Sequence, residues 1–278
     1  MRKFIIFSAC TLLLAGCTAR EVMVTDIVPL NMEIQEVKGS KVIFTMDPAN
    51  PDAWYTYGLF HESTEAYRMN DAELARLDLK LALQSYEIKK EVEEGFMTSF
   101  LDMYCMRGSR TLRATNLAPD TDYRMLVYQV NPKTQEPMVD NIISTTVHTR
   151  PVEEKDMDFT IGFDGFLLSI VPSDPERIYY WDFDLSERIY DNYLRPRYYF
   201  YSLLDMFDEY NFMDEVYSKG SEVYDLKKDN LIEGAAYTLV AGATVDEEIT
   251  SPLTLVTFTY SASGIQNIRQ YKDDGKEL

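Results

Sequence analysis

Two stretches of the chain carry the same landmarks in the same order, and this feature most restricts what the chain can fold into. Residues 42–57 align without gaps to residues 166–181, at a spacing of 124 positions. The matched landmarks in and beyond these stretches are Pro48 with Pro172, Pro51 with Pro175, Tyr55 with Tyr179, and Gly108-Ser109 with Gly220-Ser221. Such a match predicts an internal duplication, in which two units of similar fold follow one another.

The sequence of the first unit favours β-structure. Residues 41–47 and residues 123–130 alternate apolar and polar side chains, and residues 141–149 are rich in β-branched side chains. Alternation over a short run is typical of a strand with one buried face, and β-branched residues favour strands. The unit is therefore predicted to be a sandwich or barrel of short strands.

A turn motif that ends in tyrosine also occurs twice. In residues 117–123, "LAPDTDY", a Pro-Asp turn leads to Tyr123 at the start of an alternating strand. In residues 231–237, "LIEGAAY", Tyr237 lies at the same distance from the leucine, and Gly234 occupies the turn. This spacing resembles the tyrosine corner of fibronectin type III and related immunoglobulin-like sandwiches. The resemblance implies that Tyr123 and Tyr237 are structural, and that each hydroxyl donates a hydrogen bond to backbone upstream.

The predicted fold class is mainly β, with two tandem immunoglobulin-like (fibronectin type III-like) β-sandwiches. Each sandwich is expected to carry a helical insertion after its third strand. The expected division is a lipoprotein signal peptide at 1–16, a lipid anchor and tether at 17–21, a first sandwich at 22–150, a second sandwich at 152–262, and a polar C-terminal tail at 263–278.

Both insertions show helix signals. In the first unit, Asn70 and Glu73 have the spacing of a capping box, and apolar residues follow at helical intervals. This stripe consists of Leu74, Leu77, Leu81, Ile88 and Val92. In the second unit, Pro196 suits the first turn of a helix. A helix with an apolar stripe must lie on its own sandwich, on the other domain or on a partner.

The N-terminus has the pattern of an export signal. Two basic residues precede an apolar segment at 4–14, which is too short to span a bilayer. The following "LAGC" resembles the lipobox of bacterial lipoproteins, and the resemblance implies that Cys17 is lipidated and becomes the first mature residue. An ordinary secretory signal that is cleaved elsewhere is the alternative. No later stretch reaches ~18 consecutive apolar residues, the length that a membrane span requires.

Composition narrows the possible partners. Without Arg2 and Lys3 the mature chain has 25 basic residues against 46 acidic ones, a formal charge of −21. Such a surface repels phosphate backbones, so nucleic acid is not an expected partner. Only Cys105 remains as a free thiol after removal of Cys10 and lipidation of Cys17, so an intrachain disulfide or thiolate cage is excluded. Cys105 is expected to be a small buried apolar residue.

The search for catalytic and metal-binding motifs is mostly negative. Residues 61–65, "HESTE", resemble half of a zinc-protease helix, but Glu65 stands where the second histidine would be. His148 is expected at the end of a strand beside a solvated carboxylate. Asp182 and Asp184 share one face of a strand and could serve a glycosidase, although such pairs arise by chance in an acidic chain. We therefore expect no enzyme activity, no cofactor and no metal, with a carboxylate-dependent hydrolase of the cell envelope as the alternative.

Residues 179–217 hold 14 aromatic side chains in 39 positions. Tyrosine and tryptophan offer flat amphipathic surface to sugars and proteins, so Tyr179, Trp181, Tyr198 and Tyr201 are the candidate binding aromatics. The alternative is that these rings pack a helix against the second sandwich. Four consecutive aromatics at 198–201 spread around a helical turn, so at least one ring should be exposed.

As a whole, the chain resembles the tandem immunoglobulin-like lipoproteins of Bacteroidota envelopes. The resemblance implies a non-enzymatic lipoprotein, held at the outer membrane by an acyl anchor, that binds a glycan, a peptide or an envelope protein, or that assembles with one. Thr18, Ala19 and Arg20 follow the cysteine before the first acidic residue. Both the periplasmic leaflet and the cell surface therefore stay open as locations.

Overall fold

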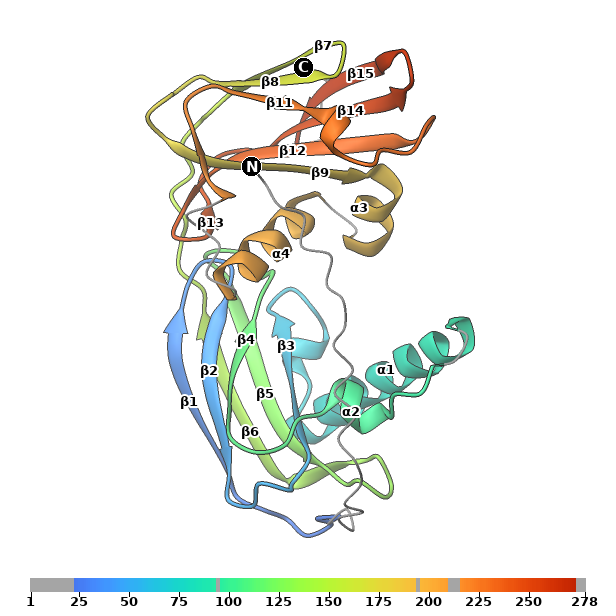
Figure 1. Ribbon diagram of the computed structural model, residues 1–278. Coiled ribbons are helices and arrows are strands. Elements are labelled where there is room, and N and C mark those ends of the chain that lie inside the picture. The colour runs from blue at the N-terminus through green and yellow to red at the C-terminus, as the bar shows by residue number, and fades with distance from the viewer. Residues whose placement is uncertain (1–22, 94–95, 194–195, 210–215, 274–278) are drawn as a thin grey trace.

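The computed structural model describes residues 23–93, 96–193, 196–209 and 216–273, and it shows two β-sandwiches stacked end to end (Figure 1). The predicted lipobox at 14–17 lies outside the described residues. Within the described part of the chain, no helix is both long enough and apolar enough to cross a membrane.

The first sandwich consists of two antiparallel sheets. The strands β1, β2 and β4 form one sheet, and β3, β5 and β6 form the other. Their bounds are β1 (Leu30–Val37), β2 (Val42–Pro48), β3 (Tyr55–His61), β4 (Arg110–Ala114), β5 (Asp122–Val130) and β6 (Pro137–His148). Apolar side chains that alternate along these strands meet between the sheets, among them Val42, Phe44, Met125 and Val127.

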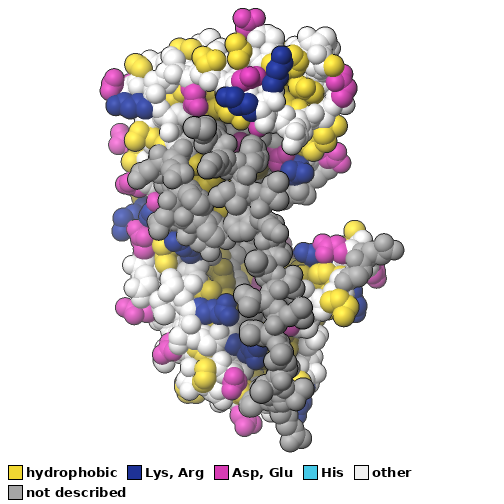
Figure 2. All heavy atoms as spheres, in the orientation of Figure 1, with side chains coloured by type: hydrophobic (Ala, Val, Ile, Leu, Met, Phe, Trp, Pro, Cys, Tyr) yellow, Lys and Arg dark blue, Asp and Glu magenta, His cyan; other side chains and the backbone are white. Residues whose placement is uncertain are grey.

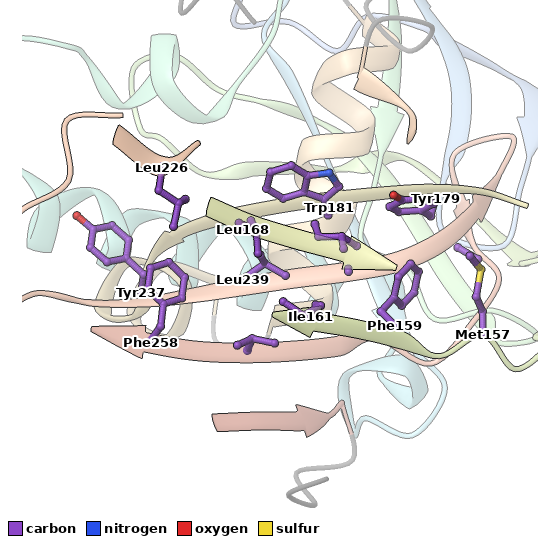
Figure 3. Close-up of a cluster of buried hydrophobic side chains, with 14 residues drawn as sticks. Met157, Phe159, Ile161, Leu168, Tyr179, Trp181, Leu226, Tyr237, Leu239 and Phe258 are labelled. Carbon is purple, nitrogen blue, oxygen red and sulfur yellow. The ribbon is translucent and has the colours of Figure 1, made fainter. Parts of the chain in front are cut away.

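The second sandwich repeats this arrangement and adds short edge strands. One sheet has the order β11-β8-β7, and the other has the order β10-β9-β12-β14-β15, with β13 paired to β12. The bounds are β7 (Phe159–Asp164), β8 (Leu167–Pro172), β9 (Ile178–Leu185), β10 (Ser218–Lys219), β11 (Glu222–Asp225), β12 (Ala236–Val245), β13 (Glu248–Ile249), β14 (Thr254–Ser261) and β15 (Gly264–Lys272). Figure 3 shows its core, where Trp181, Leu239 and Phe258 pack between the sheets.

The helices lie where the insertions were predicted, between the third strand of each sandwich and the strand that rejoins the opposite sheet. The first insertion contains η1 (Ala66–Arg68), α1 (Asp71–Val92) and α2 (Phe100–Tyr104), and the second contains α3 (Ser186–Tyr193) and α4 (Pro196–Glu209); a further turn, η2 (Leu226–Lys228), follows β11. The Asn70 side chain accepts a hydrogen bond from the Glu73 amide at 2.9 Å and caps α1. The predicted fold class, including both insertions, is confirmed.

The matched landmarks make the same hydrogen bond in both units. The Tyr55 hydroxyl donates to the Gly108 carbonyl at 2.8 Å, and the Tyr179 hydroxyl donates to the Gly220 carbonyl at 2.8 Å. Both glycines have a positive φ, +69° and +70°, which glycine adopts without the steric penalty of a Cβ atom. Residues at matched positions thus make the same hydrogen bond in both repeats, as an internal duplication predicts.

The tyrosine corners are present in both units, with one correction. The Ala118 amide donates to the Tyr123 hydroxyl at 2.8 Å, and the Ile232 amide donates to the Tyr237 hydroxyl at 2.9 Å. Each hydroxyl therefore accepts a hydrogen bond from the upstream backbone, whereas the sequence predicted that it donates. The upstream carbonyls accept hydrogen bonds from other donors: the Thr149 hydroxyl donates to the Ala118 carbonyl, and the Ala235 amide donates to that of Ile232.

The C-terminal segment differs from the prediction of a polar tail. Residues 264–272 form β15, which pairs along its length with β14 and extends the larger sheet. The Gln270 side chain donates to the Phe159 carbonyl at 2.9 Å and ties the strand to β7. The sequence of the strand is polar because the strand lies at the edge of a sheet, where four of its nine residues are exposed and four are part-exposed.

Only the start of the apolar stripe predicted for α1 is covered: Leu74 is buried and Leu77 is part-buried. Leu81, Ile88 and Val92 have exposed fractions of 51%, 63% and 77%. The buried residues are Leu74, Ala75 and Leu79, with Ala82, Leu83 and Tyr86 partly covered. Only the first half of α1 lies on the β3–β5–β6 sheet, and the second half stands away from the body (Figures 1 and 2).

Charged residues join the two sandwiches. Lys38 and Lys41 both pair with Glu247, the latter at 2.7 Å, and the Ser40 amide donates to Glu248 at 3.0 Å. The intervening residue, Gly39, packs so closely that a Cβ atom there would lie 2.3 Å from a Val152 methyl group. The joint is therefore a packed contact between the domains in addition to the covalent connection.

Candidate functional site

The predicted aromatic surface of the second unit is mostly interior. Tyr179 and Trp181 have exposed fractions of 0% and 1% and point into the sandwich core, and Tyr180 points to the opposite face of β9. On that face Tyr180 packs against Phe200 and Phe207 of α4, with ring centroids 5.3 and 5.5 Å apart. Because β9 is covered on both faces, its rings cannot contact a partner.

The helical rings of this stretch divide between core and surface. Tyr199, Phe200 and Tyr201 are buried, whereas Tyr198 is 37% exposed, so one ring of the four faces solvent as expected. The prediction of exposed binding aromatics is therefore wrong for Tyr179, Trp181 and Tyr201. Of the four candidates, Tyr198 alone is accessible. The buried rings serve to hold the second insertion on its sheet, which is the alternative raised from the sequence.

The residues considered for metal binding do not converge. The Ser63 amide donates to His61 Nδ1 at 3.0 Å, and the imidazole of His61 contacts the Tyr123 ring. His148 lies beside Asp122 and Asp120 at 2.8 and 3.2 Å, at the exposed end of β6, and these hydrogen bonds raise its pKa. Among the described residues, no group of three or more side chains is arranged to hold a metal ion.

The carboxylate pair considered for hydrolysis is engaged locally. Asp182 accepts the Phe183 amide at 2.9 Å and the Tyr199 hydroxyl at 3.2 Å. Asp184 accepts the Leu185 amide at 2.7 Å and forms an ion pair with Arg188 at 3.1 Å. These bonds fix both carboxylates to the start of the second insertion, and no observation assigns them to a substrate cleft.

A pocket that the sequence did not predict lies beneath the first insertion. It has a volume of about 360 Å³ and lies between the inner face of α1 and the sheet that β3 and β5 form. The sheet supplies Thr56 from β3 and Tyr128 from β5, which are cross-strand partners. The helix supplies Asp78, Leu79 and Ala82. We call this the insertion pocket.

The segment that follows α2 forms a side wall of the insertion pocket. Met103, Tyr104, Cys105 and Met106 line it. The wall is attached to β3, because the Thr56 hydroxyl donates to the Tyr104 carbonyl at 2.9 Å. Met106 and Tyr55 also exchange backbone hydrogen bonds of 2.8 and 3.0 Å. These hydrogen bonds join the side wall of the pocket to β3.

Asp78 is the chemical centre of the insertion pocket. The Tyr128 hydroxyl donates to its carboxylate at 2.8 Å. Gly58 of β3 gives the carboxylate room, since a Cβ atom there would lie 3.0 Å from both of its oxygens. Burial raises the pKa of Asp78, while the hydrogen bond from Tyr128 partly offsets this rise. A desolvated carboxylate next to an open volume is a typical feature of a ligand site.

The other titratable groups of the insertion pocket are held neutral. Burial raises the pKa of the Cys105 thiol to about 12 and also raises the pKa of Tyr128, and the charge of Asp78 adds to both shifts. Cys105 is buried, as the sequence predicted, and its neutral thiol is a poor nucleophile. The pocket therefore presents one carboxylate among neutral aromatic and sulfur-containing side chains.

A weak signal for this site exists in the sequence. Leu74, Ala75, Asp78, Leu79 and Ala82 fall on one side of a helix, so an acidic residue interrupts an apolar face. The apolar stripe that continues through Leu81 and Ile88 is longer, so the sequence pattern favours that side of the helix over this one. The partner residues Thr56 and Tyr128 come from distant strands, and no local pattern connects them to Asp78.

The comparisons with known proteins return structures and no sequence relative. No protein-family model matches the chain, and no curated protein matches it. The crystal structure of chicken CNTN1 FN1–FN3 domains aligns with 90% of this chain and 87% of its own, at 10% identity and a TM-score of 0.27. The central fibronectin-III array of RIM-binding protein aligns with 86% of this chain at 10% identity and a TM-score of 0.23, and the chain spans 58% of its length. Similarity at this level carries no functional argument.

Proposed function

We propose that this chain is a non-enzymatic binding and assembly module of the cell envelope, in which the first repeat carries the ligand site and the second repeat supports it. The observation that carries the proposal is the insertion pocket. Its volume falls within the range of small-molecule and side-chain sites, about 300–1,000 Å³. A helix, two strands and the segment after α2 form its walls, and the partly desolvated carboxylate of Asp78 lines it.

The second repeat supports this assignment by contrast. Its insertion lies on the equivalent sheet face, but Tyr180, Phe200 and Phe207 fill the space between helix and sheet. A repeat that is sealed in this way suits a spacer that positions its neighbour. The packed joint through Glu247 and Glu248 would hold the two repeats in one orientation.

The proposed location rests on the lipobox. We propose that Cys17 is acylated and that the mature chain is anchored in the outer membrane, with a glycan, a peptide or an envelope protein as its partner. Cys17→Ser should move the protein from the membrane fraction to the soluble fraction. Mass spectrometry that found an unmodified N-terminus beyond residue 17 would refute the anchor without affecting the pocket.

A binding screen tests the function itself. Purified chain 21–278, which retains every described residue, would be screened against glycans, peptides and envelope proteins. Ala82→Leu narrows the insertion pocket from the helix side, and Leu81→Ala changes the neighbouring exposed position as the matched control. We expect the partner to be lost with Ala82→Leu and retained with Leu81→Ala. Equal binding by both variants would exclude the pocket as the site.

A further inference from the structure

The insertion pocket has a composition that selects for the charge of its ligand. The titratable residues that line it are Tyr57, Tyr104, Tyr128, Cys105 and Asp78. Burial raises the pKa of Tyr57, Tyr128 and the Cys105 thiol, which keeps these three groups protonated, and Asp78 supplies the one carboxylate among the lining residues. No lysine, arginine or histidine is among the residues that line the pocket.

The Asp78 carboxylate therefore lacks a counter-ion within the described residues. Its hydrogen-bond partner is the neutral Tyr128 hydroxyl, and no ion pair joins it to a basic side chain in that part of the chain. Asp78 is partly buried, and a partly buried carboxylate without a cation is unfavourable, because burial removes water and nothing of opposite charge replaces it. Such a group is satisfied when a ligand brings the missing positive charge.

The remaining walls suit an organic cation better than a metal ion. Met103, Tyr104 and Tyr128 provide a polarizable sulfur atom and aromatic rings, whereas the Tyr57 and Met106 side chains pack toward the core between the sheets. Aromatic rings attract ammonium groups, whereas hard metal ions require several oxygen ligands. With one carboxylate and a volume of about 360 Å³, the pocket has room for an ammonium group together with its carbon chain.

The charge of the whole molecule acts in the same direction. The formal net charge of −19 attracts cations and raises their concentration at the surface. This field does not select among cations, but it favours encounter. The selection depends on the pocket.

We propose that the insertion pocket binds the ammonium group of an alkylamine, with the Asp78 carboxylate as its counter-ion and the Tyr128 hydroxyl as the group that orients the carboxylate. This inference rests on the proposed function and specifies its ligand. The amine can belong to a free small molecule or to a lysine side chain of a peptide, since both present the same chemistry.

Calorimetric titration with probes of matched size tests the proposal. The probes are butylammonium, Nα-acetyl-lysine methylamide, neutral butanol and butyrate, each titrated into chain 21–278. Both ammonium probes should bind. Butanol should bind at least about tenfold more weakly, because a hydrogen bond between two charged groups is stronger than one to a neutral group. Preference for the lysine derivative would assign the site to peptides, and preference for butylammonium would assign it to free amines.

Two variants link the preference to the carboxylate. Asp78→Asn keeps the shape of the side chain and the hydrogen bond from Tyr128 but removes the charge. The ammonium probes should therefore bind this variant at least about tenfold more weakly. Asp102→Asn removes the same charge from the exposed surface of α2 and should leave binding unchanged. Thermal melting of each variant shows whether it is folded, and Ala82→Leu provides a second block that leaves Asp78 in place.

The failures of the two proposals are distinguishable. If Asp78→Asn binds the ammonium probes as tightly as the wild type does, or if no ammonium probe binds the wild type, the cation proposal is wrong. The proposed function still stands in that case if Ala82→Leu abolishes binding of the partner found in the screen. If that partner also binds Ala82→Leu, both proposals are wrong.

Discussion

The two repeats differ at one pair of facing strand positions beneath the insertion, where the large and the small residue change places. In the first repeat, Thr56 of β3 lies opposite Tyr128 of β5. In the second repeat, the equivalent pair is Tyr180 of β9 opposite Gly242 of β12. Each pair contains one tyrosine and one small residue on the sheet face that the insertion covers, but the strand that carries the tyrosine is exchanged.

The exchange decides whether the insertion encloses a pocket. The Tyr180 ring packs on two phenylalanines of α4, and Gly242 leaves room for Leu253, whose methyl would lie 2.5 Å from a Cβ atom there. The second insertion is thereby sealed onto its sheet. In the first repeat the Tyr128 hydroxyl instead donates to Asp78, and the smaller Thr56 leaves space next to it. One duplicated scaffold thus carries a filled version and an open version of the same site.

Removal of the sealing ring should have the largest effect. Tyr180→Thr copies the first repeat and opens a cavity beneath α4, and loss of a large buried ring costs about 3–5 kcal/mol of unfolding free energy. Urea titration measures this loss. The matched control is Tyr190→Thr in the same insertion, where the ring is 43% exposed and the change should stay within about 0.5 kcal/mol. Equal losses for the two variants would show that the ring does not seal the second insertion.

The tyrosine corners should respond alike, because both repeats make the same bond. Tyr123→Phe and Tyr237→Phe each leave a part-buried amide without its partner, that of Ala118 or Ile232, and each should cost about 1 kcal/mol. Urea midpoints measure the cost, with Tyr198→Phe as the exposed control. A response in only one variant would show that the corner has an energetic role in one repeat alone.

Much of the scaffold could be predicted from the sequence because its signals are local. The corner motifs place a turn, a tyrosine and a strand within a few residues, and Asp120 and Gly234 at the matched turn positions both adopt a positive φ. The insertion helices also begin at local signals, the cap at Asn70 and the proline at Pro196. Short-range patterns of this kind need no knowledge of the tertiary structure.

The site was not predicted because its determinants are non-local. Whether Trp181 faces a ligand or the core depends on which element covers β9, and both faces of that strand proved to be covered. The stripe that includes Ile88 is a regular apolar face by spacing, yet the helix extends beyond the sheet that could bury it. The insertion pocket joins Asp78 and Tyr128, which are 50 positions apart. The spacing of apolar residues shows which face of a helix or strand is apolar, but it does not show which other element covers that face.

A smaller effect is expected from the charge of the open site. Burial raises the pKa of Asp78 above its ordinary value of 3.8, so the folded chain holds this proton more tightly than the unfolded chain does. The contribution of Asp78 to stability therefore falls as pH rises through the interval between 3.8 and the raised pKa, and the ionised form is unfavourable above it. Asp78→Asn removes this dependence and should raise the melting temperature at pH 7.

The pH series makes that prediction specific. The gain in melting temperature from Asp78→Asn should grow as pH rises above 3.8, because the wild type ionises through its raised pKa and the variant does not. Asp102→Asn, measured in parallel, accounts for the loss of one negative charge from the molecule. A gain that is constant with pH would show that the Asp78 carboxylate is not desolvated, and the contrast between an open and a sealed site would lose its energetic basis.

The smallest effect concerns Cys105, the single thiol of chain 21–278, which lines the open site. Cationic and anionic methanethiosulfonates of equal size should label it at different rates. The field of Asp78 attracts the cationic reagent and repels the anionic one. A charge pair at 4 Å across water is worth about 1 kcal/mol, so the two rates should differ by about 2 kcal/mol, which corresponds to a rate ratio of about thirty. Both rates should rise with pH, since the thiolate reacts and the pKa of Cys105 is raised to about 12.

The ratio of the cationic to the anionic labelling rate depends on the charge in the pocket and not on the reactivity of the thiol, because both reagents react with the same thiolate. Asp78→Asn should accelerate both reagents, because the charge of Asp78 helps to raise the pKa of Cys105, yet the ratio should fall to that of the urea-unfolded chain. Thr56→Tyr, which copies the residue of the second repeat, should slow both reagents by filling the space beside Cys105. If the native and unfolded chains gave the same ratio, the carboxylate would exert no field at the thiol. The difference between the repeats would then be one of packing alone, because a filled and an unfilled cavity would not differ in the charge that they present to a ligand.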